Sequence, residues 1–329
     1  MSWLSYCYKT YQNSVSEIGK QQPGKVPLLP VAHTTQQVNI EVELDKDGNF
    51  QYAGLLAQDQ RTTIIPCTEE SSARTSGMVP HPLVDKLQYI AADYPTFGGS
   101  KESGWPLYHK QLQAWCTSPY AHPAVCTVLP YLEKECLIAD LVKANILFID
   151  ENGTLPTKWQ GNKEDKPPIL DTLAGSDQTE SFVRFRVDNV DLSRDTTVRE
   201  SFIRFYETQL KDIDYCTVQG IKMPVSTLSP YKIRNPGDRA KLISSNDNTN
   251  YTYRGRFADA AALADAVART WGQGAWLRYV VLTGGEPMLQ IDDALIDALH
   301  ARGFEIGVES NGTIAAHPGI DWLCISPKA

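Results

Sequence analysis

The chain changes character between two neighbouring stretches, Tyr231–Phe257 (YKIRNPGDRAKLISSNDNTNYTYRGRF) and Val280–Leu289 (VVLTGGEPML). The first is polar, with arginines, lysines, asparagines and tyrosines close together. The second is an apolar run that ends in a glycine turn, a pattern typical of a strand followed by a ligand-binding loop. Two parts with different chemistry are therefore predicted, residues 1–256 and residues 257–329.

The bulk composition is that of an ordinary globular protein. Hydrophobic residues make up 42% of the 329 residues and charged residues 21%, so the chain is expected to bury a sizeable core. No apolar run is long enough to span a membrane, and the first residues lack the pattern of a signal peptide. We therefore expect a soluble, cytoplasmic protein. The seven cysteines are odd in number and widely spaced, which argues against a disulfide framework.

The charge balance gives no general attraction for nucleic acid. The formal net charge is −8. Residues 257–329 carry 4 Lys and Arg against 9 Asp and Glu, a net −5, and the other residues carry 27 against 30, a net −3. Neither part is basic, so nucleic-acid binding would have to come from local patches.

The N-terminal part is expected to be α+β with antiparallel hairpins. Period-two alternation in Gln37–Leu44 and Asn49–Leu56, with Asp45-Lys-Asp-Gly-Asn between them, predicts a hairpin. The other expected strands are Thr62–Pro66, Ile146–Ile149, Glu180–Val187 and a hairpin at Tyr215–Val225. The expected helices are His81–Tyr94, His109–Thr117, Val128–Ala144 and Asp195–Leu210. Polar loops are expected at Thr68–Pro82 and Asp150–Pro168.

The C-terminal part alternates strands with helices. The expected helices are Ala260–Trp271 and Asp292–Arg302, and the expected strands are Leu277–Leu282, Phe304–Val308 and Trp322–Ile325. Strand–helix–strand order predicts a parallel sheet, so this part is expected to be an α/β fragment.

The polar stretch 231–257 combines the groups that contact nucleic acid. Its candidate residues are Lys232, Arg234, Asn235, Arg239, Lys241, Asn246, Arg254 and Arg256. Cations suit phosphates, amides suit base edges, and the tyrosines offer faces for stacking. The alternative is a solvated loop whose arginines pair with Asp238 and Asp247.

A second candidate surface is the polar loop Thr68–Met78. Arg74, Thr75 and Ser76 could enter a groove and contact base edges, although an ordinary exposed loop fits the same composition. Arg199 and Arg204, on the helix expected at 195–210, are predicted to lie on its solvated face.

Residues 1–256 resemble a known family along most of their length. The stretches that carry the resemblance are, in order, MSWLSYCYKTY, LLPVAHTTQQVNIEVELDKDGNF, SSARTSGMVPHPLVDKLQYIAADY, FVRFRVDNVDLSRDTTVRESFIRFYETQL and IRNPGDRAKLISSNDNTNYTYRGRF. They are similar to the large subunit of the type I-C CRISPR interference complex, Cascade. The resemblance implies a non-enzymatic subunit for antiviral defence. It would contact the motif that flanks the target, help to open the duplex and stabilise the R-loop, while the guide RNA pairs with the rest.

The same resemblance implies the partners. These are the other subunits of the CRISPR RNA–protein complex, target double-stranded DNA and a helicase-nuclease. Members of that family continue into a helical C-terminal region that this sequence lacks, so the large-subunit part is expected to be truncated.

The C-terminal part resembles a second family. TGGEP at 283–287, ESNGT at 309–313 and SPK at 326–328 follow successive expected strands. Together they are similar to radical S-adenosylmethionine enzymes, and most of all to 7-carboxy-7-deazaguanine synthase of queuosine biosynthesis, over Gly255–Ala329. The resemblance implies a partial (β/α) barrel. It places Gly284, Gly285 and Glu286 at the methionine amino group, and Glu309, Asn311, Ser326 and Lys328 along the cofactor or substrate pocket.

The cysteines do not match the chemistry of that second family. Its iron–sulfur cluster needs three closely spaced cysteines, and no Cys-x-x-Cys occurs in the chain. Cys116, Cys126 and Cys136 are ten residues apart, and Cys324 is alone in the C-terminal part. We therefore expect a vestigial binding turn, with no bound cofactor, no metal and no catalysis.

Three functional hypotheses remain open at this point. The chain is a DNA-binding subunit, an enzyme-like protein that binds S-adenosylmethionine, or a non-functional fusion. A fusion could have arisen by recombination or by sequence misassembly at Gly255-Arg256-Phe257, which fits both families.

Overall fold

The computed structural model describes most of the chain. The described residues are 3–21, 27–74, 77–156, 159, 161–162, 164, 166–173, 175, 177–216, 221–226, 260–274, 276–283 and 286–326. Two compact units divide them. One lies within 17–209, and the other takes in the described parts of 1–16, 210–227 and 245–329.

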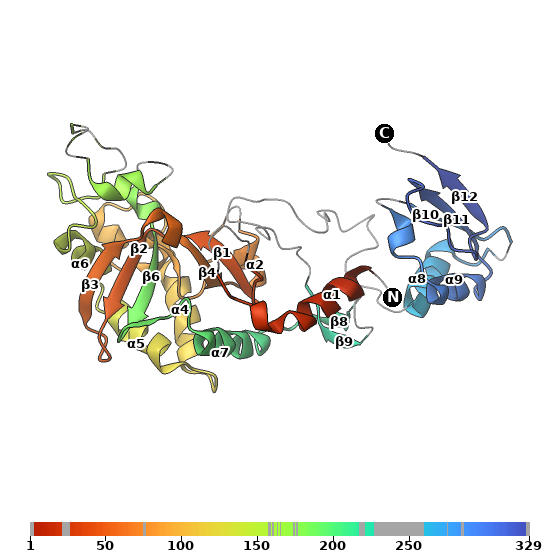
Figure 1. Cartoon of the computed structure of the whole chain (residues 1–329), viewed down its shortest axis with the longest axis horizontal. Helices are drawn as coiled ribbons and strands as arrows, with labels where there is room; N and C mark the ends of the chain where they lie inside the picture. Colours follow the sequence, from red (N-terminus) through yellow and green to blue (C-terminus); the bar gives the residue numbers. More distant parts are fainter. Residues whose placement is uncertain are drawn as a thin grey trace. The chain divides into compact units, whose positions relative to one another are not determined.

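Helices and strands are interspersed along the chain (Figure 1). The α-helices are α1 (Trp3–Asn13), α2 (Glu69–Ser72), α3 (Leu87–Ile90), α4 (Trp105–Cys116), α5 (Pro123–Leu132), α6 (Leu137–Lys143), α7 (Thr196–Glu207), α8 (Ala260–Trp271) and α9 (Asp293–His300). The 3-10 turns are η1 (Val15–Glu17), η2 (Gln58–Gln60), η3 (Tyr94–Phe97), η4 (Pro168–Asp171), η5 (Gln178–Glu180) and η6 (Pro287–Leu289). The strands are β1 (His33–Gln37), β2 (Ile40–Leu44), β3 (Phe50–Leu55), β4 (Thr62–Pro66), β5 (Asp85–Lys86), β6 (Phe182–Val187), β7 (Val190–Asp191), β8 (Ile213–Tyr215), β9 (Lys222–Pro224), β10 (Tyr279–Leu282), β11 (Glu305–Ser310) and β12 (Trp322–Ile325).

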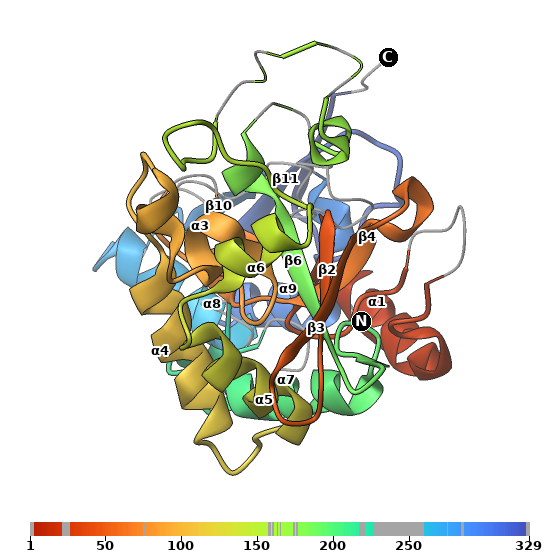
Figure 2. The same ribbon diagram turned by 90° about the vertical axis from the view of Figure 1, so that its left-hand side faces the viewer.

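A five-stranded mixed sheet organises the 17–209 unit. Its order is β3-β2-β6-β5, with β7 paired to β6. The strands β3, β2 and β6 lie side by side in Figure 2. β2 and β3 are antiparallel, as the sequence predicted, whereas β2 and β6 are parallel although about 140 residues separate them. β1 pairs with β4 in a separate antiparallel ribbon. The central strand β6 is therefore far from its neighbour β2 in the sequence.

The predicted hairpin is confirmed, and its turn explains it. Asp45 Oδ1 accepts the backbone N–H groups of Asp47 at 2.9 Å and Asn49 at 2.8 Å. Gly48 has a φ of 75°, in the left-handed region where glycine carries no steric penalty. The turn residues thus satisfy their own backbone and set the register of the two strands.

Aromatic packing joins α4 to α7 within the core. The Trp115 ring lies 5.1 Å from the Phe202 ring, edge to face, and is stacked at 6.2 Å on the Phe205 ring. The indole Nε1 of Trp115 donates to Ser201 Oγ at 2.9 Å. The buried tryptophan therefore keeps its polar atom bonded, as a low-dielectric core requires.

The helix predicted at His81–Tyr94 is wrong. Leu83 has a φ of 63°, which interrupts a right-handed helix, and only the single turn α3 forms. Asp85 and Lys86 instead pair antiparallel with Val183 and Phe182 of β6. Pairing with a distant strand outweighs the local period of leucines.

Three further predictions need correction. The helix expected over Val128–Ala144 is broken into α5 and α6, and Glu135 between them has a φ of 55°. Ile146–Ile149 is not a strand, because the amide side chain of Gln178 pairs with the Phe148 backbone. Gln178 Oε1 accepts from Phe148 N at 3.0 Å, and Gln178 Nε2 donates to Phe148 O at 3.1 Å. The loop predicted at Thr68–Pro82 also contains the short helix α2.

The segment 260–326 forms a three-stranded parallel sheet of order β10-β11-β12. Ile306 and Val308 on β11 are buried with Ile296 and Leu299 of α9 and Ala264 of α8. The parallel order is that expected of βαβ connections.

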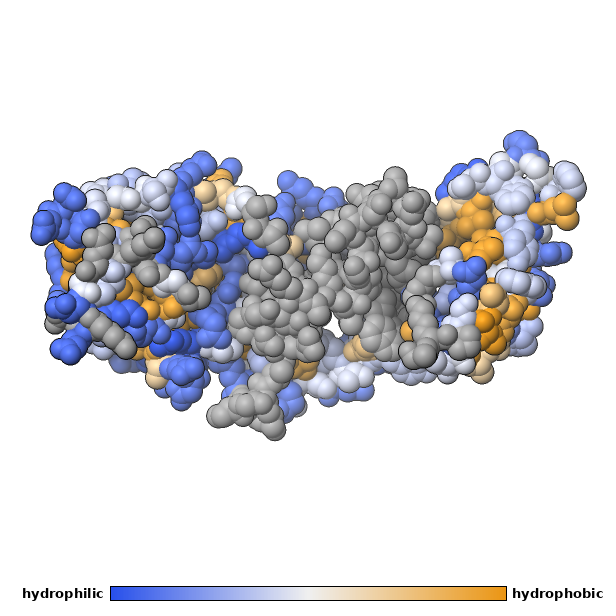
Figure 3. Space-filling model, turned by 90° about the horizontal axis from the view of Figure 1, so that it is seen from above, coloured by the Kyte–Doolittle hydropathy of each residue, from blue (hydrophilic) through white to orange (hydrophobic). Residues whose placement is uncertain are grey.

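The opposite face of this sheet carries exposed apolar side chains. Tyr279 and Val281 on β10 are 36% and 43% exposed, and Trp322 on β12 is 52% exposed. Hydrophobic residues are visible on the surface of the segment in Figure 3. One face of the sheet is therefore packed by helices, and the other is left to solvent.

Among the helices that the structure describes, none is long and apolar enough to cross a lipid bilayer.

Candidate functional site

The polar stretch predicted to bind nucleic acid lies outside the described residues. This applies to Lys232, Arg234, Asn235, Arg239, Lys241, Asn246, Arg254 and Arg256. Thr75, Ser76, Gly284, Gly285 and Lys328 are also outside them. The predicted residues whose geometry is defined are Arg74, Glu286, Glu309, Asn311 and Ser326.

Arg74 anchors the base of the 68–82 loop. Its Nη1 and Nη2 donate to the two carboxylate oxygens of Asp85 at 2.8 Å and 3.0 Å, and Nη1 also donates to Val79 O at 2.8 Å. The guanidinium lies 4.5 Å from the centroid of the Tyr89 ring. With the Asp85 side chain fully buried, this is a closed bidentate pair. The geometry gives Arg74 a structural role, whereas the sequence predicted a base-contacting one.

A buried histidine continues this network. His81 is 1% exposed, its backbone N–H donates to Asp85 Oδ2 at 2.7 Å, and its Nδ1 lies 3.0 Å from Ser71 Oγ. Ser71 in turn forms a capping box with Thr68 at the start of α2. Both ends of the loop are thus tied to one buried polar cluster, which holds its flanks in place around Thr75 and Ser76.

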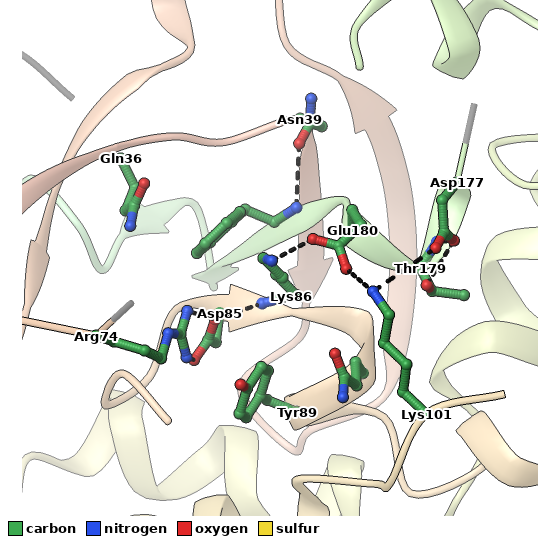
Figure 4. Close-up of polar contacts among 12 residues, drawn as sticks. Gln36, Asn39, Arg74, Asp85, Lys86, Tyr89, Lys101, Asp177, Thr179 and Glu180 are labelled. Carbon is green, nitrogen blue, oxygen red and sulfur yellow. Dashed lines mark hydrogen bonds and ion pairs between the residues drawn. The ribbon is translucent and has the colours of Figure 1, made fainter. Parts of the chain in front are cut away.

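Two lysines converge on Glu180 beside this cluster (Figure 4). Lys101 Nζ lies 2.6 Å from Glu180 Oε1 and 4.0 Å from Asp177 Oδ2, and Lys86 pairs with the other oxygen of Glu180. Burial works to raise the pKa of Glu180, but the bonds from Lys101 and Lys86 outweigh it and lower that pKa. Lys86, Lys101 and Glu180 were missed by sequence reasoning, because nothing in the local pattern joins three residues from separate segments.

Glu286 stands at the carboxyl edge of the parallel sheet and is held by its neighbours. Its Oε1 accepts from Ser310 Oγ at 2.8 Å and from Met288 N at 3.1 Å, and its Oε2 accepts from Asn311 N at 2.9 Å. Its slight burial acts to raise the pKa, but these bonds outweigh it and lower the pKa of Glu286. The carboxylate is therefore ionised and oriented before any ligand arrives.

The structure brings the other C-terminal candidates to the same edge. Glu309 Oε2 accepts from Thr283 Oγ1 at 2.8 Å, and Ser326 N donates to Ser310 O at 2.8 Å. Glu286, Glu309, Asn311 and Ser326 thus lie toward the carboxyl ends of β10, β11 and β12, the edge that the resemblance implied for them.

The residues present do not fit an iron–sulfur cluster. Cys324, half-buried on β12, is the single cysteine of residues 257–329 in the sequence. Within the described ranges, no group of three or more His, Cys, Asp or Glu is placed to hold a metal ion. Burial raises the pKa of the Cys116 and Cys136 thiols, and Cys136 reaches about 11, so neither is poised as a thiolate ligand.

Arg199 departs most from its predicted place. It was expected on a solvated helix face with Arg204, but it is 8% exposed. Its Nη1 and Nη2 donate to the backbone oxygens of Gly19 at 3.1 Å and Ser193 at 2.8 Å. Arg204 is exposed, as expected.

Comparison with curated proteins finds short, strong matches to one enzyme. Over 80 residues the chain is 68% identical to the 7-carboxy-7-deazaguanine synthase of Bradyrhizobium diazoefficiens, which covers 24% of this chain and 38% of that protein. The values are 61% over 74 residues for the Bordetella pertussis enzyme (22% and 35%) and 54% over 97 residues for the Caulobacter vibrioides enzyme (28% and 46%). The chain thus spans less than half the length of these curated relatives.

The comparison with protein families covers far more of the chain. A family model described as CRISPR-associated protein (Cas_Csd1) matches residues 7–279. The boundary predicted at residue 256 lies inside this match, which ends at the first residue of β10. The similarity to 7-carboxy-7-deazaguanine synthases covers about a quarter of the chain, whereas the family model covers most of it. The chain therefore belongs to the Cas_Csd1 family of CRISPR-associated proteins, the Cascade large subunit that the sequence resemblance indicated.

Proposed function

We propose that this protein is the DNA-binding large subunit of a type I-C CRISPR RNA-guided surveillance complex, acting in antiviral defence. The family match over residues 7–279 is the observation that carries the proposal. The subunit contacts the motif flanking the target, helps to open the duplex and stabilises the R-loop. Its partners are the other RNA–protein subunits, target double-stranded DNA and a helicase-nuclease. No catalytic step is assigned to it.

The contacts at both flanks of the 68–82 loop also support this proposal. Arg74 before the loop tip is bonded to Asp85 and Val79, and Gly77 O after it accepts from Tyr89 OH at 3.4 Å. A loop held at both flanks loses less conformational entropy on binding than a free one. In this proposal Arg74 positions the loop, and Thr75 and Ser76 contact base edges.

The phosphate contacts are assigned to Lys232, Arg234, Arg239 and Lys241. Each cation that neutralises a phosphate releases counterions, so affinity falls with salt. We expect the full-length double variant Arg234→Ala/Lys241→Ala to bind a labelled duplex more weakly and to lower the log–log salt slope by about 2. Fluorescence anisotropy over a salt series measures both quantities.

A matched control removes one arginine and one lysine elsewhere. Arg204→Ala/Lys143→Ala changes two exposed cations outside both predicted surfaces, and it should leave the salt slope unchanged. Equal binding by the wild type and Arg234→Ala/Lys241→Ala at low salt would sink the proposal. A separate variant, Thr75→Ala/Ser76→Ala, should reduce the preference among flanking sequences without changing the slope.

For residues 257–329 we propose a piece of a (β/α) radical-SAM barrel that is inactive as an enzyme. The identity to 7-carboxy-7-deazaguanine synthases supports the relationship. The uncovered face of β10–β12, with Val281 and Trp322 exposed, supports an incomplete barrel, because that face would point to the interior of a closed one. Gly284, Gly285 and Glu286, with Glu309, Asn311, Ser326 and Lys328, would form the remnant of the binding edge.

Sequencing the gene distinguishes the third hypothesis, a non-functional fusion, from the other two. A single sequencing read across the codons for Gly255-Arg256-Phe257 tests whether both parts share one gene. Neighbouring CRISPR genes would favour the large subunit, queuosine genes would favour the enzyme-like protein, and a break in coverage would favour a misassembly.

A further inference from the structure

A basic hollow lies on the 17–209 unit, and none of the described residues that line it is one assigned above to DNA. Its volume is about 480 Å³, and among the described residues it is lined by Gly19, Lys20, Gln21, Arg194 and Arg199. Three of these five residues are cationic and none is acidic. The hollow therefore has the charge and polarity of an anion site.

Gly19 and Arg199 form the floor of the hollow together. Gly19 has a φ of 75°, and a Cβ added to it would lie 2.2 Å from Arg199 Nη1. Its N–H donates to Leu28 O at 2.7 Å, and its carbonyl oxygen accepts from Arg199 Nη1 at 3.1 Å. Only glycine provides both the backbone angle and the space, so residue 19 lets the guanidinium rest against the main chain.

Arg199 is a buried cation with bonding capacity left over. At 8% exposed it donates to two carbonyl oxygens, and its Nε finds no acceptor among the residues that the structure describes. No carboxylate among those residues is within ion-pair distance of it. A guanidinium has five N–H donors, and a buried charge without a bonded counterion is costly.

The surroundings of Arg199 show how incomplete its neutralisation is. Burial lowers the pKa of Arg199, while the more distant carboxylates of Asp191 and Asp195 act to raise it and Arg194 adds to the lowering. An anion in the hollow would supply the missing negative charge next to the guanidinium. Arginine binds phosphate in particular, because two of its parallel N–H groups match two phosphate oxygens.

The two rim cations are free to turn toward such an anion. Lys20 Nζ lies 3.2 Å from Glu17 Oε1, with side chains 57% and 55% exposed. Arg194 Nε lies 3.5 Å from Asp191 Oδ2, and the Arg194 side chain is 58% exposed. The Lys20–Glu17 pair is exposed on both sides and contributes little in water, so Lys20 can leave it at small cost. The Asp191 side chain is itself only 10% exposed and also accepts from Ser193 N, so it is the exposed Arg194 side chain that would turn toward a phosphate.

We propose that this hollow binds a phosphate group, with Arg199 as the fixed ligand and Lys20 and Arg194 as movable ones. The phosphate belongs either to a free phosphate compound, such as a nucleotide, or to the backbone of a polynucleotide. The site is independent of the proposed function, because it uses none of the residues assigned there to DNA.

The first experiment compares phosphate with an inert anion. The full-length chain is heated with inorganic phosphate or with chloride at equal ionic strength, and the midpoint of thermal unfolding is recorded. A ligand that binds only the folded state raises this midpoint. We expect a rise with phosphate that is absent with chloride, and equal midpoints in the two anions would overturn the proposal.

The second experiment uses variants that leave the floor of the hollow intact. Lys20→Gln/Arg194→Gln changes exposed side chains, and we expect it to weaken phosphate binding by about tenfold. Arg204→Gln on α7 is the matched control and should bind like the wild type. If the double variant keeps wild-type affinity by calorimetry, the assignment is wrong.

Gly19→Ala tests the floor itself. Its methyl group would displace the Arg199 guanidinium, so phosphate binding should be lost even though every cation remains. An undiminished affinity in a folded Gly19→Ala protein would contradict the assigned role of Arg199.

The two sources of phosphate are separated with a single-stranded oligonucleotide. Backbone binding predicts that Lys20→Gln/Arg194→Gln weakens its binding as well, whereas a free phosphate compound predicts that only phosphate and nucleotide binding weaken. Either outcome supports the site. Residues 231–257 are intact in these variants. A negative result with them therefore does not bear on the proposed DNA contacts, and a negative result with Arg234→Ala/Lys241→Ala does not bear on the phosphate site.

Discussion

At the scale of single residues, the buried charges decide more than the exposed ones. Asp85 is fully buried and depends on Arg74 for its counterion. The His33 ring is also buried, and no carboxylate among the described residues is bonded to it. Burial removes water, so each such group is stabilised only by the partner that the fold provides. Two predictions follow from these two residues.

Replacing Arg74 by alanine leaves the Asp85 carboxylate buried and without its bidentate partner. Such a loss typically lowers the free energy of unfolding by about 3 kcal/mol. Urea unfolding of Arg74→Ala measures this, and Arg204→Ala, an exposed arginine, should change stability by less than about 0.5 kcal/mol. An Arg74→Ala protein as stable as the wild type would mean that the arginine is not the structural anchor described above.

His33 should make stability depend on pH. Burial lowers its pKa to about 4; the bond to Val31 O acts in the opposite direction but is outweighed by burial, and the charge of Arg199 adds a smaller lowering. In the unfolded chain His33 is therefore protonated as the pH falls below 6.5, whereas in the folded chain it is protonated only near pH 4. The free energy of unfolding should fall by about 3 kcal/mol as the pH falls through this window. A His33→Gln variant should lose this part of the slope, and identical slopes would refute the assignment.

At the scale of elements, the ends of helices are stabilised by identifiable caps. Asp195 Oδ1 accepts from Thr197 N at 2.7 Å and from Val198 N at 3.2 Å at the start of α7. The sequence places an aspartate directly before an amphipathic run, and this cap was predictable. The cap of α6 was not predictable, because Asp93 Oδ2, far away in the chain, accepts from Ile138 N at 2.9 Å and Ala139 N at 3.1 Å.

Removing the α7 cap tests this account. Asp195→Ala leaves two amide donors without an acceptor and should lower the free energy of unfolding by about 1 kcal/mol. Asp195→Asn keeps an oxygen acceptor and should recover most of that loss. Urea unfolding of the three proteins makes the comparison, and equal losses in Asp195→Ala and Asp195→Asn would show that charge, rather than hydrogen bonding, is what the cap supplies.

At the scale of the whole molecule, the described residues form two separate cores. One core consists of residues between Val38 and Phe205 with their partly buried neighbours, and the other of residues between Ala264 and Val308 with theirs. The two buried sets share no residue, so each part of the chain encloses its own apolar side chains.

We expect a chain that ends at residue 256 to fold without the C-terminal part. Its main unfolding transition in urea should have the midpoint of the full-length protein, because the core around β2 and β6 is unchanged. The isolated residues 257–329 should instead self-associate, since Val281 and Trp322 leave an apolar face exposed. Light scattering of the two pieces makes the comparison, and a 1–256 chain that unfolds at clearly lower urea would contradict it.

We also expect no radical S-adenosylmethionine activity from the full chain. The chemistry needs three neighbouring thiolates, and the sequence has no Cys-x-x-Cys. Anaerobic reconstitution with iron and sulfide, followed by an assay for 5′-deoxyadenosine, is the measurement. A four-iron cluster signal together with 5′-deoxyadenosine would show that the binding edge around Glu286 is still a working site.

What the sequence determined by itself was local. The turn Asp45–Asn49 specified the hairpin of β2 and β3, the short stretches Thr62–Pro66 and Trp322–Ile325 were predicted as the strands that became β4 and β12, and the motifs after three strands carried the resemblance that placed Glu286 at a binding edge. In each case the residues that decide the structure are neighbours in the chain, so the periodicity and turn chemistry of a short stretch are sufficient.

Only the tertiary structure decided which distant groups meet. The parallel pairing of β2 with β6, the pairing of Gln178 with the Phe148 backbone, and the burial of Arg199 against Gly19 each join segments that are far apart in sequence. Arg74 likewise changed from a candidate DNA contact to the counterion of Asp85. The reason is that a buried polar group must find its partner wherever the fold provides one, and that demand leaves no signature in the residues beside it.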